Sequence, residues 1–101
     1  MGAIYIIRHG LTNLYKVGTV DTLTNHTVQK RLRQLQSGNP IPLNVEYVSK
    51  DTRERVTVER EIHILLKNRN IRGEWFEIEN INDVKQLIDQ YISSYEISRK
   101  R

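Results

Sequence analysis

The sequence predicts an α+β fold in which helices pack on a small sheet. Short apolar segments near the N-terminus, separated by turn residues, are typical of strands. Three later segments instead carry apolar residues at the three- and four-residue spacing of amphipathic helices. The two kinds of segment follow one another in the order ββαβα(β)α, which favours a mixed α+β architecture.

Residues 3–8 and 14–20 are predicted to form a β-hairpin. The first run is apolar on both faces, as in a strand that is covered on two sides. The turn includes Gly10 and Asn13, residue types that tolerate the positive φ angles of hairpin turns. Tyr5 and Lys16 then fall on adjacent strands, where a phenol and an ammonium group interrupt otherwise apolar runs.

A loop and a helix are predicted next. Residues 21–26 are polar and rich in Thr and Asn, and either Asn25 or Thr27 can cap the helix that follows. The apolar stripe of this helix consists of Val28, Leu32 and Leu35. The helix is expected to end at Gly38, because Gly, Asn and Pro follow one another there.

The middle of the chain predicts a strand, a helix and a short extended segment. Residues 43–49 alternate in polarity as a third strand, and residues 52–68 show the apolar side of a second helix. Residues 73–79, "GEWFEIE", are expected to be extended, with Trp75 and Phe76 pointing inward.

The clearest helical pattern lies near the C-terminus. Apolar residues between 84 and 95 recur at helical spacing after the capping candidates Asn80 and Asn82. The expected organisation is therefore a core over residues 1–79, a C-terminal helix over 80–96 that packs on it, and a basic tail over 97–101.

Composition narrows the functional classes. A chain of 101 residues without cysteine has room for one domain, no disulfides and no thiolate metal site, which fits an intracellular location. No apolar run approaches the roughly 20 residues that span a bilayer, so no membrane association is expected. A net charge of +4 and a pI near 9.6 favour a polyanionic partner. The oligomeric state stays open.

Helical geometry separates polar residues that can reach a cleft from those that cannot. Each helical residue advances about 100°, which places Arg31 beside the apolar stripe of the first helix and Arg33 well away from it. In the second helix Glu59 lies on the border of the apolar face, and His63 follows one turn later. A carboxylate at such a margin suits a hard divalent cation.

Each of these candidate site residues also has a purely structural interpretation. Glu59 can be a solvated residue or an i,i+4 partner of Arg55 or His63, and His63 can be an ordinary surface or half-buried histidine. Lys16 can be an edge-strand charge that discourages aggregation. Tyr5 can be a core aromatic residue whose hydroxyl finds a partner.

Taken together, these segments resemble the GIY-YIG nuclease superfamily, in particular its small stand-alone branch in phages, bacteria and large DNA viruses. The matching stretches are "AIYII", "LYKVG", "KRLRQLQSGNP", "VEREIH" and "RGEWFEI", which contains the closing "GEWF", in order over residues 3–78. The resemblance implies a three-stranded antiparallel or mixed sheet flanked by helices. It also implies a DNA endonuclease that uses one divalent cation, Mg²⁺ or Mn²⁺.

The resemblance assigns roles by position. Tyr5 corresponds to the tyrosine of the first signature, Gly18 to the glycine of the second, Arg31 to the catalytic arginine and Glu59 to the metal-binding glutamate. His63 is a secondary catalytic candidate, which could orient a water or touch phosphate.

The sequence departs from the family pattern at several places, including a longer loop between Gly18 and Arg31 and no match to a late asparagine. Ala3 replaces the first glycine, Lys16 stands where the second signature has tyrosine, and Leu35 occupies a position that is often histidine or tyrosine. The family includes members with lysine at the second position. We therefore expect Lys16 to keep Tyr5 partly deprotonated, or to accept its proton, so that Tyr5 acts as the general base.

The basic side chains are expected to contact DNA phosphates without reading sequence. The candidates are Lys30, Arg33, Lys67, Arg69, Arg72 and the terminal residues 99–101. The alternative is a catalytically inactive nucleic-acid-binding module of the same fold, and a basic interaction domain without nucleic-acid function is a third hypothesis.

Overall fold

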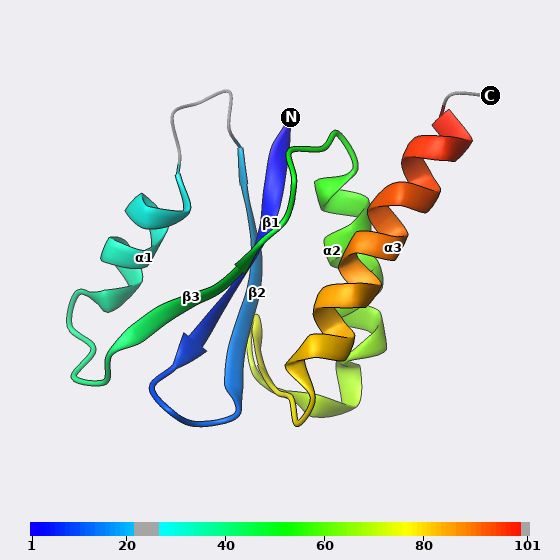
Figure 1. Ribbon diagram of the computed structural model, residues 1–101. Helices are drawn as coiled ribbons and strands as arrows, with labels where there is room; N and C mark the ends of the chain where they lie inside the picture. The colour runs from blue at the N-terminus through cyan, green and yellow to red at the C-terminus, as the bar shows by residue number, and fades with distance from the viewer. Residues whose placement is uncertain (22–26, 100–101) are drawn as a thin grey trace.

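The computed structural model of the protein describes residues 1–21 and 27–99. A twisted sheet forms the middle layer, with helix α1 (Val28–Gln36) on one face and helices α2 (Arg55–Leu65) and α3 (Ile81–Arg99) on the other (Figure 1). Residues 22–26 of the predicted loop, including Asn25, and the last two residues of the basic tail lie outside the described residues. None of the described helices is both long and apolar enough to cross a membrane.

Within residues 1–21 and 27–99 the sheet has five strands rather than the predicted three. In spatial order they are β3 (Leu43–Val48), β1 (Gly2–His9), β2 (Leu14–Asp21), β5 (Trp75–Glu77) and β4 (Asn70–Arg72). All four strand pairs are antiparallel, which decides between the antiparallel and mixed alternatives. The three strands that were predicted form the contiguous group β3-β1-β2.

Of the two additional strands, β5 lies within the segment 73–79 that was expected to be extended, whereas β4 was not predicted. Each is only three residues long, too short to show alternation. The predicted second helix ran to residue 68, whereas α2 ends at Leu65 and the short 3-10 helix Lys67–Arg69 follows it. Strand β4 then turns back into β5 through Gly73, whose φ of 56° favours glycine. The segment 73–79 is therefore half of a hairpin.

The helix ends follow local capping chemistry. Thr27 is the N-cap of α1, and its hydroxyl accepts a hydrogen bond of 3.1 Å from the Lys30 backbone N–H. Such a cap contributes about 1 kcal/mol. Helix α3 continues to Arg99, three residues beyond the predicted boundary at 96.

Two apolar cores hold the layers together. The larger one lies between the sheet and helices α2 and α3, and includes Ile4, Ile6, Tyr15, Val17, Val58, Ile62, Phe76, Ile88 and Ile92. The smaller one lies under α1 and includes Ala3, Tyr5, Ile7, Val20, Val28 and Leu43. Phe76 is buried in the first core, whereas Trp75 is only half-buried against the second. The sheet is thus covered on both faces, and Tyr5 lies on the α1 side.

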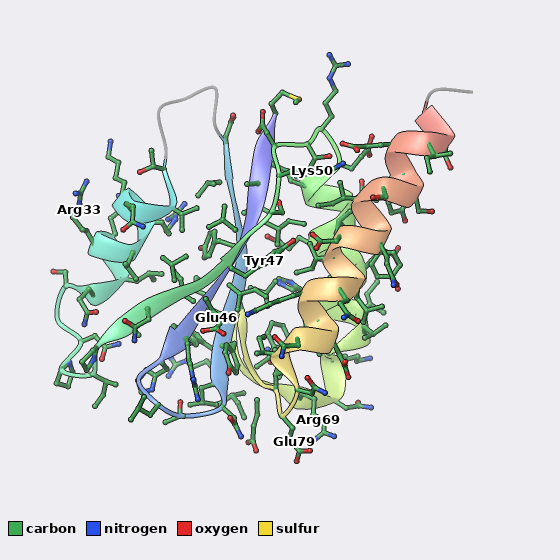
Figure 2. The ribbon with its side chains drawn as sticks, viewed as in Figure 1. Arg33, Glu46, Tyr47, Lys50, Arg69 and Glu79 are labelled. Atoms are coloured by element: carbon green, nitrogen blue, oxygen red, sulfur yellow. The ribbon has the colours of Figure 1, made fainter. Side chains whose placement is uncertain are left out.

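Polar contacts tie α3 to strand β3. Tyr47 donates a hydrogen bond to the Asp89 carboxylate, and Lys85 Nζ lies 3.1 Å from Glu46 Oε1. Near the start of the next loop, Lys50 Nζ lies 2.7 Å from Glu96 Oε1. The labelled side chains of Glu46, Tyr47 and Lys50 in Figure 2 follow this seam. Burial and the Asp89 carboxylate both raise the pKa of Tyr47, so it stays a hydrogen-bond donor at neutral pH.

Candidate active site at the open edge of strand β2

The candidate site lies where strand β2 loses its outer neighbour. Strand β5 pairs with β2 only from Leu14 to Lys16, which leaves the rest of that edge without a strand partner among the described residues. A cavity of about 290 Å³ occupies this place. It is lined by Tyr5, Lys16, Thr19, Arg31, Leu35, Glu59 and Glu74. Side chains from both faces of the sheet therefore meet at one edge.

Tyr5 reaches the cavity by crossing strand β2. It pairs with Gly18 on the neighbouring strand, and its ring lies over that glycine. A Cβ atom at position 18 would lie 2.5 Å from Tyr5 Oη and 2.6 Å from Cζ. Tyr5 is only 2% exposed, so a methyl group at position 18 would have to push its ring out of a packed position. Glycine at position 18 is thus the condition for the phenol to reach the edge.

Replacing Gly18 with alanine is expected to displace Tyr5 and to destabilise the fold. The added methyl group would overpack a close contact, at a cost of about 1–3 kcal/mol. For a domain of this size each kcal/mol lowers Tm by about 4–8 °C. Thermal unfolding followed by circular dichroism measures the effect. A Gly18→Ala variant that melts like the wild type would contradict this account of the Tyr5 position.

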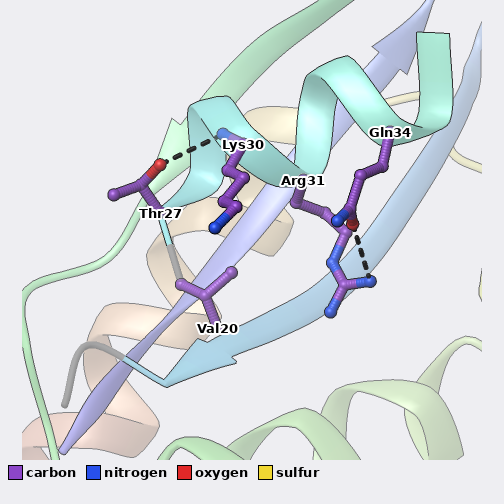
Figure 3. Close-up of a pocket in the computed structure, with 5 residues that line it drawn as sticks. All are labelled: Val20, Thr27, Lys30, Arg31 and Gln34. Atoms are coloured by element: carbon purple, nitrogen blue, oxygen red, sulfur yellow. Dashed lines mark hydrogen bonds between the residues drawn. The ribbon is translucent and has the colours of Figure 1, made fainter. Parts of the chain in front are cut away.

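Arg31 approaches the cavity from helix α1. Figure 3 shows its guanidinium extending from the helix beside Gln34, whose Oε1 lies 3.5 Å from Arg31 Nη1. The same side chain also lines a smaller pocket with Val20, Thr27 and Lys30. Arg33 is exposed and points away from the sheet (Figure 2). The angular distinction made from the sequence therefore matches the observed positions of the two arginines.

Glu59 faces Arg31 and Tyr5 from helix α2, on the opposite side of the sheet. It is half-buried and forms a side-chain hydrogen bond with Thr19. Burial raises the pKa of Glu59, and the nearby Glu74 carboxylate raises it further. His63, Thr19 and Lys16 act in the opposite direction. A carboxylate held this close to a second one is an electrostatic environment that favours a cation.

His63 lies one helical turn after Glu59 and has a structural partner. Its Nε2 atom is 2.9 Å from the carbonyl oxygen of Val17. Because a carbonyl oxygen can only accept, Nε2 carries the proton and donates this hydrogen bond. The bond satisfies an edge carbonyl of β2 that no strand pairs. Only Nδ1 of His63 is then left for a ligand.

Glu74 is the site residue that the sequence interpretation missed. It stands in the turn between β4 and β5, and its Oε1 lies 2.8 Å from Lys16 Nζ. The sequence identifies "GEWF" as a closing motif but gives its glutamate no role. The reason is that the β4–β5 hairpin, which positions Glu74, was not predicted. One donor atom each from Glu59, His63 and Glu74 lie within 4.8 Å of one another.

The expected effect of Lys16 on Tyr5 is wrong for this structure. Burial is the largest influence and raises the pKa of Tyr5 to about 12; Arg31 lowers it, whereas Glu74 and Glu59 raise it. The Lys16 ammonium group is instead paired with Glu74. Tyr5 is therefore a neutral phenol at pH 7 in the metal-free protein.

The predicted DNA-contacting residues between Lys30 and Arg72 are on the surface. Lys30, Arg33, Lys67, Arg69 and Arg72 are exposed. Arg69 lies at the end of the molecule opposite the chain N-terminus (Figure 2), where it lines a separate cavity of about 130 Å³. Lys30 borders the small pocket next to Arg31. Lys30 is thus the member of this group that lies beside a residue of the main cavity.

Comparison with known protein families identifies the family of this chain. The T5orf172 domain matches residues 2–92. The chain belongs to the T5orf172 family. Every residue that lines the cavity falls within the matched segment. No curated protein and no solved structure matches the chain.

Membership of the T5orf172 family is compatible with a nuclease-type enzyme and with DNA as a partner. The cavity of this T5orf172 domain combines a phenol, a guanidinium, an ammonium and two carboxylates in one small volume. This set of groups is suited to hold a divalent cation and a phosphate at the same time.

Proposed function

We propose that this T5orf172 domain is a metal-dependent DNA endonuclease of the GIY-YIG type. The observation that carries the proposal is the meeting of Tyr5, Arg31 and Glu59 in one cavity, although they come from β1, α1 and α2. The alternative, an inactive nucleic-acid-binding module, shares the fold and the basic surface. This alternative predicts that the protein binds nucleic acid but does not cleave it.

The residues present fit a divalent cation. Glu59 and Glu74 would supply the oxygen ligands that Mg²⁺ and Mn²⁺ prefer, and a ring nitrogen of His63 lies in the same cluster of donor atoms. Glu59 is the ligand that the resemblance assigns. When bound there, such a cation supplies positive charge that stabilises the leaving 3′ oxygen and a non-bridging oxygen of the phosphate, and it lowers the pKa of nearby acids.

The chain's own groups would perform the remaining steps. Tyr5, as phenolate, takes a proton from a water molecule while that oxygen forms a bond to phosphorus and the bond to the 3′ oxygen breaks. Arg31 has a fixed charge and a planar array of donors, which stabilise the additional negative charge of the pentacoordinate transition state. Lys16, once free of Glu74, adds positive charge on the Tyr5 side of the sheet.

Exposed basic residues would hold the rest of the DNA. Lys30 lies next to Arg31 and is placed to contact a phosphate that neighbours the scissile one. Contacts of this kind neutralise charge and release counterions, so affinity should fall with salt. They do not read sequence, and this predicts weak or structure-based selectivity.

Arg31→Lys is expected to reduce cleavage about a hundredfold or more while DNA affinity changes little. Lysine keeps the positive charge but loses the planar donor array that meets a developing oxyanion. Single-turnover nicking of plasmid DNA with Mn²⁺, together with a binding titration at the same salt, separates the two effects.

Arg33→Lys is the matched control, because Arg33 is two residues away on the same helix and exposed. Its cleavage rate should equal that of the wild type. Both substitutions keep the positive charge, so equal losses in both variants would indicate a general sensitivity of helix α1 to arginine replacement and would contradict a specific role for Arg31 in the transition state.

A further inference from the structure

Glu74 is held beside the cavity by the backbone as well as by its side chain. Its carbonyl oxygen accepts a hydrogen bond of 3.1 Å from the Val17 N–H, and the next residue, Trp75, pairs with Lys16. The left-handed conformation of Gly73 makes the tight turn that brings the chain back toward β2. The position of Glu74 is thus fixed by the same strand that carries Lys16.

The donors of Glu59, His63 and Glu74 are nearly at coordination distance from a common centre. Their atoms lie within 4.8 Å of one another. Ligand distances of about 2.0–2.1 Å place donors around one small divalent cation about 3 to 4 Å apart, so a small inward shift is enough. The Glu74 side chain is 40% exposed and has room for that shift.

Lys16 holds Glu74 in this structure. The Lys16 side chain is only 13% exposed, and the distance from its Nζ to Glu74 Oε1 is 2.8 Å. A cation that recruits Glu74 would bring a double positive charge close to this ammonium, and like charges at such distances repel. The Lys16–Glu74 pair and the cation therefore compete for one carboxylate.

We propose that Glu74 is a second carboxylate ligand of the divalent cation, and that the cation takes it from Lys16. This inference rests on the proposed function, since it concerns the same cation. Lys16 and Gly18 are two residues apart on β2 and so share a face, the face on which the Tyr5 ring lies over Gly18. Release from Glu74 frees the ammonium on the Tyr5 side, so the positive charge reaches the base only after the cation has bound.

Calorimetric titration with Mn²⁺, in the absence of DNA, tests the proposal with four proteins: wild type, Glu74→Gln, Lys16→Met and the double variant. Glu74→Gln should lower Mn²⁺ affinity about tenfold or more. The matched control Glu77→Gln alters an exposed glutamate outside the cavity in the same hairpin and should leave affinity unchanged.

The double variant distinguishes competition from a general field effect. Lys16→Met should raise Mn²⁺ affinity about fivefold or more when Glu74 is present, because the ion pair no longer competes for the carboxylate. In the Glu74→Gln background the same change should have less than about a twofold effect. An equal gain in both backgrounds would reflect only the loss of a nearby charge and would overturn the competition.

The remaining outcomes separate this inference from the proposed function. Wild-type affinity in Glu74→Gln would overturn the inference even if the protein cleaves DNA. The expected pattern of affinities in a protein that never cleaves DNA would support the inference and overturn the function. If circular dichroism shows that Glu74→Gln does not fold, Lys16→Met alone decides, and no gain in affinity overturns the proposal.

Discussion

Glu59→Gln is expected to reduce DNA cleavage by at least about a thousandfold while the protein stays folded. The substitution keeps the shape of the side chain and its capacity to accept the Thr19 hydrogen bond, but it removes the negative charge that would hold the cation. Single-turnover nicking of supercoiled plasmid in Mg²⁺ or Mn²⁺ measures the loss. No other single change is expected to have a larger effect.

The thermal stability of Glu59→Gln distinguishes a loss of metal binding from a loss of folding. The pKa of Glu59 is raised in the folded protein, chiefly by burial and then by Glu74, so the ionised form destabilises the fold as pH rises through the carboxyl range. Glutamine avoids that cost at pH 7, and the Tm of Glu59→Gln should equal or exceed that of the wild type. The control is Glu79→Gln, an exposed position at the far end of the molecule (Figure 2). Full cleavage by Glu59→Gln, or equal loss in the control, would contradict the metal-binding role.

Tyr5→Phe is expected to lower the cleavage rate by about 10²–10⁴-fold, the range for loss of a general base. Phenylalanine fills the same buried space and removes only the hydroxyl that reaches the cavity. Loss of folding is not expected, because the hydroxyl group lies at the end of a ring whose packing is unchanged. The rate is measured under single-turnover conditions at saturating protein.

The pH dependence of the cleavage rate tests whether Tyr5 is the general base. Burial raises the pKa of Tyr5 to about 12, and because this exceeds the ordinary value of 10, the neutral phenol contributes stability below pH 10 that is lost between pH 10 and 12. Below its pKa the phenolate fraction grows tenfold per pH unit. The wild-type rate should therefore rise steeply between pH 7 and 9, and Tyr5→Phe should show a flat profile. A wild-type rate that is flat over this interval would contradict a tyrosine base of high pKa.

The elements with strong periodicity could be predicted from the sequence, and those without it could not. The first three strands and all three α-helices carry enough alternating or helical apolar positions to be found. Strands β4 and β5 have three residues each, and their pairing depends on contacts with β2 that are distant in sequence. The end of α2 was placed too late for the same reason, since the 3-10 helix after it continues the helical pattern.

Some residues of the candidate site could likewise be predicted from the sequence, and others could not. Arg31 and Glu59 could be singled out because helical angles relate them to apolar stripes on their own elements. Glu74 could not, because nothing local marks a turn glutamate as close to Lys16, a residue 58 positions earlier. That missing contact also explains the wrong expectation for Lys16, whose ammonium group is paired with the Glu74 carboxylate.

The most direct test of the account is the conversion of supercoiled plasmid to the nicked form by the purified wild-type protein. We expect nicking with Mn²⁺ or Mg²⁺, none after the metal is removed by a chelator, and none with Glu59→Gln at the same protein concentration. A plasmid that stays supercoiled under all conditions, or that is nicked equally by both proteins, would show that the edge of β2 does not hydrolyse DNA.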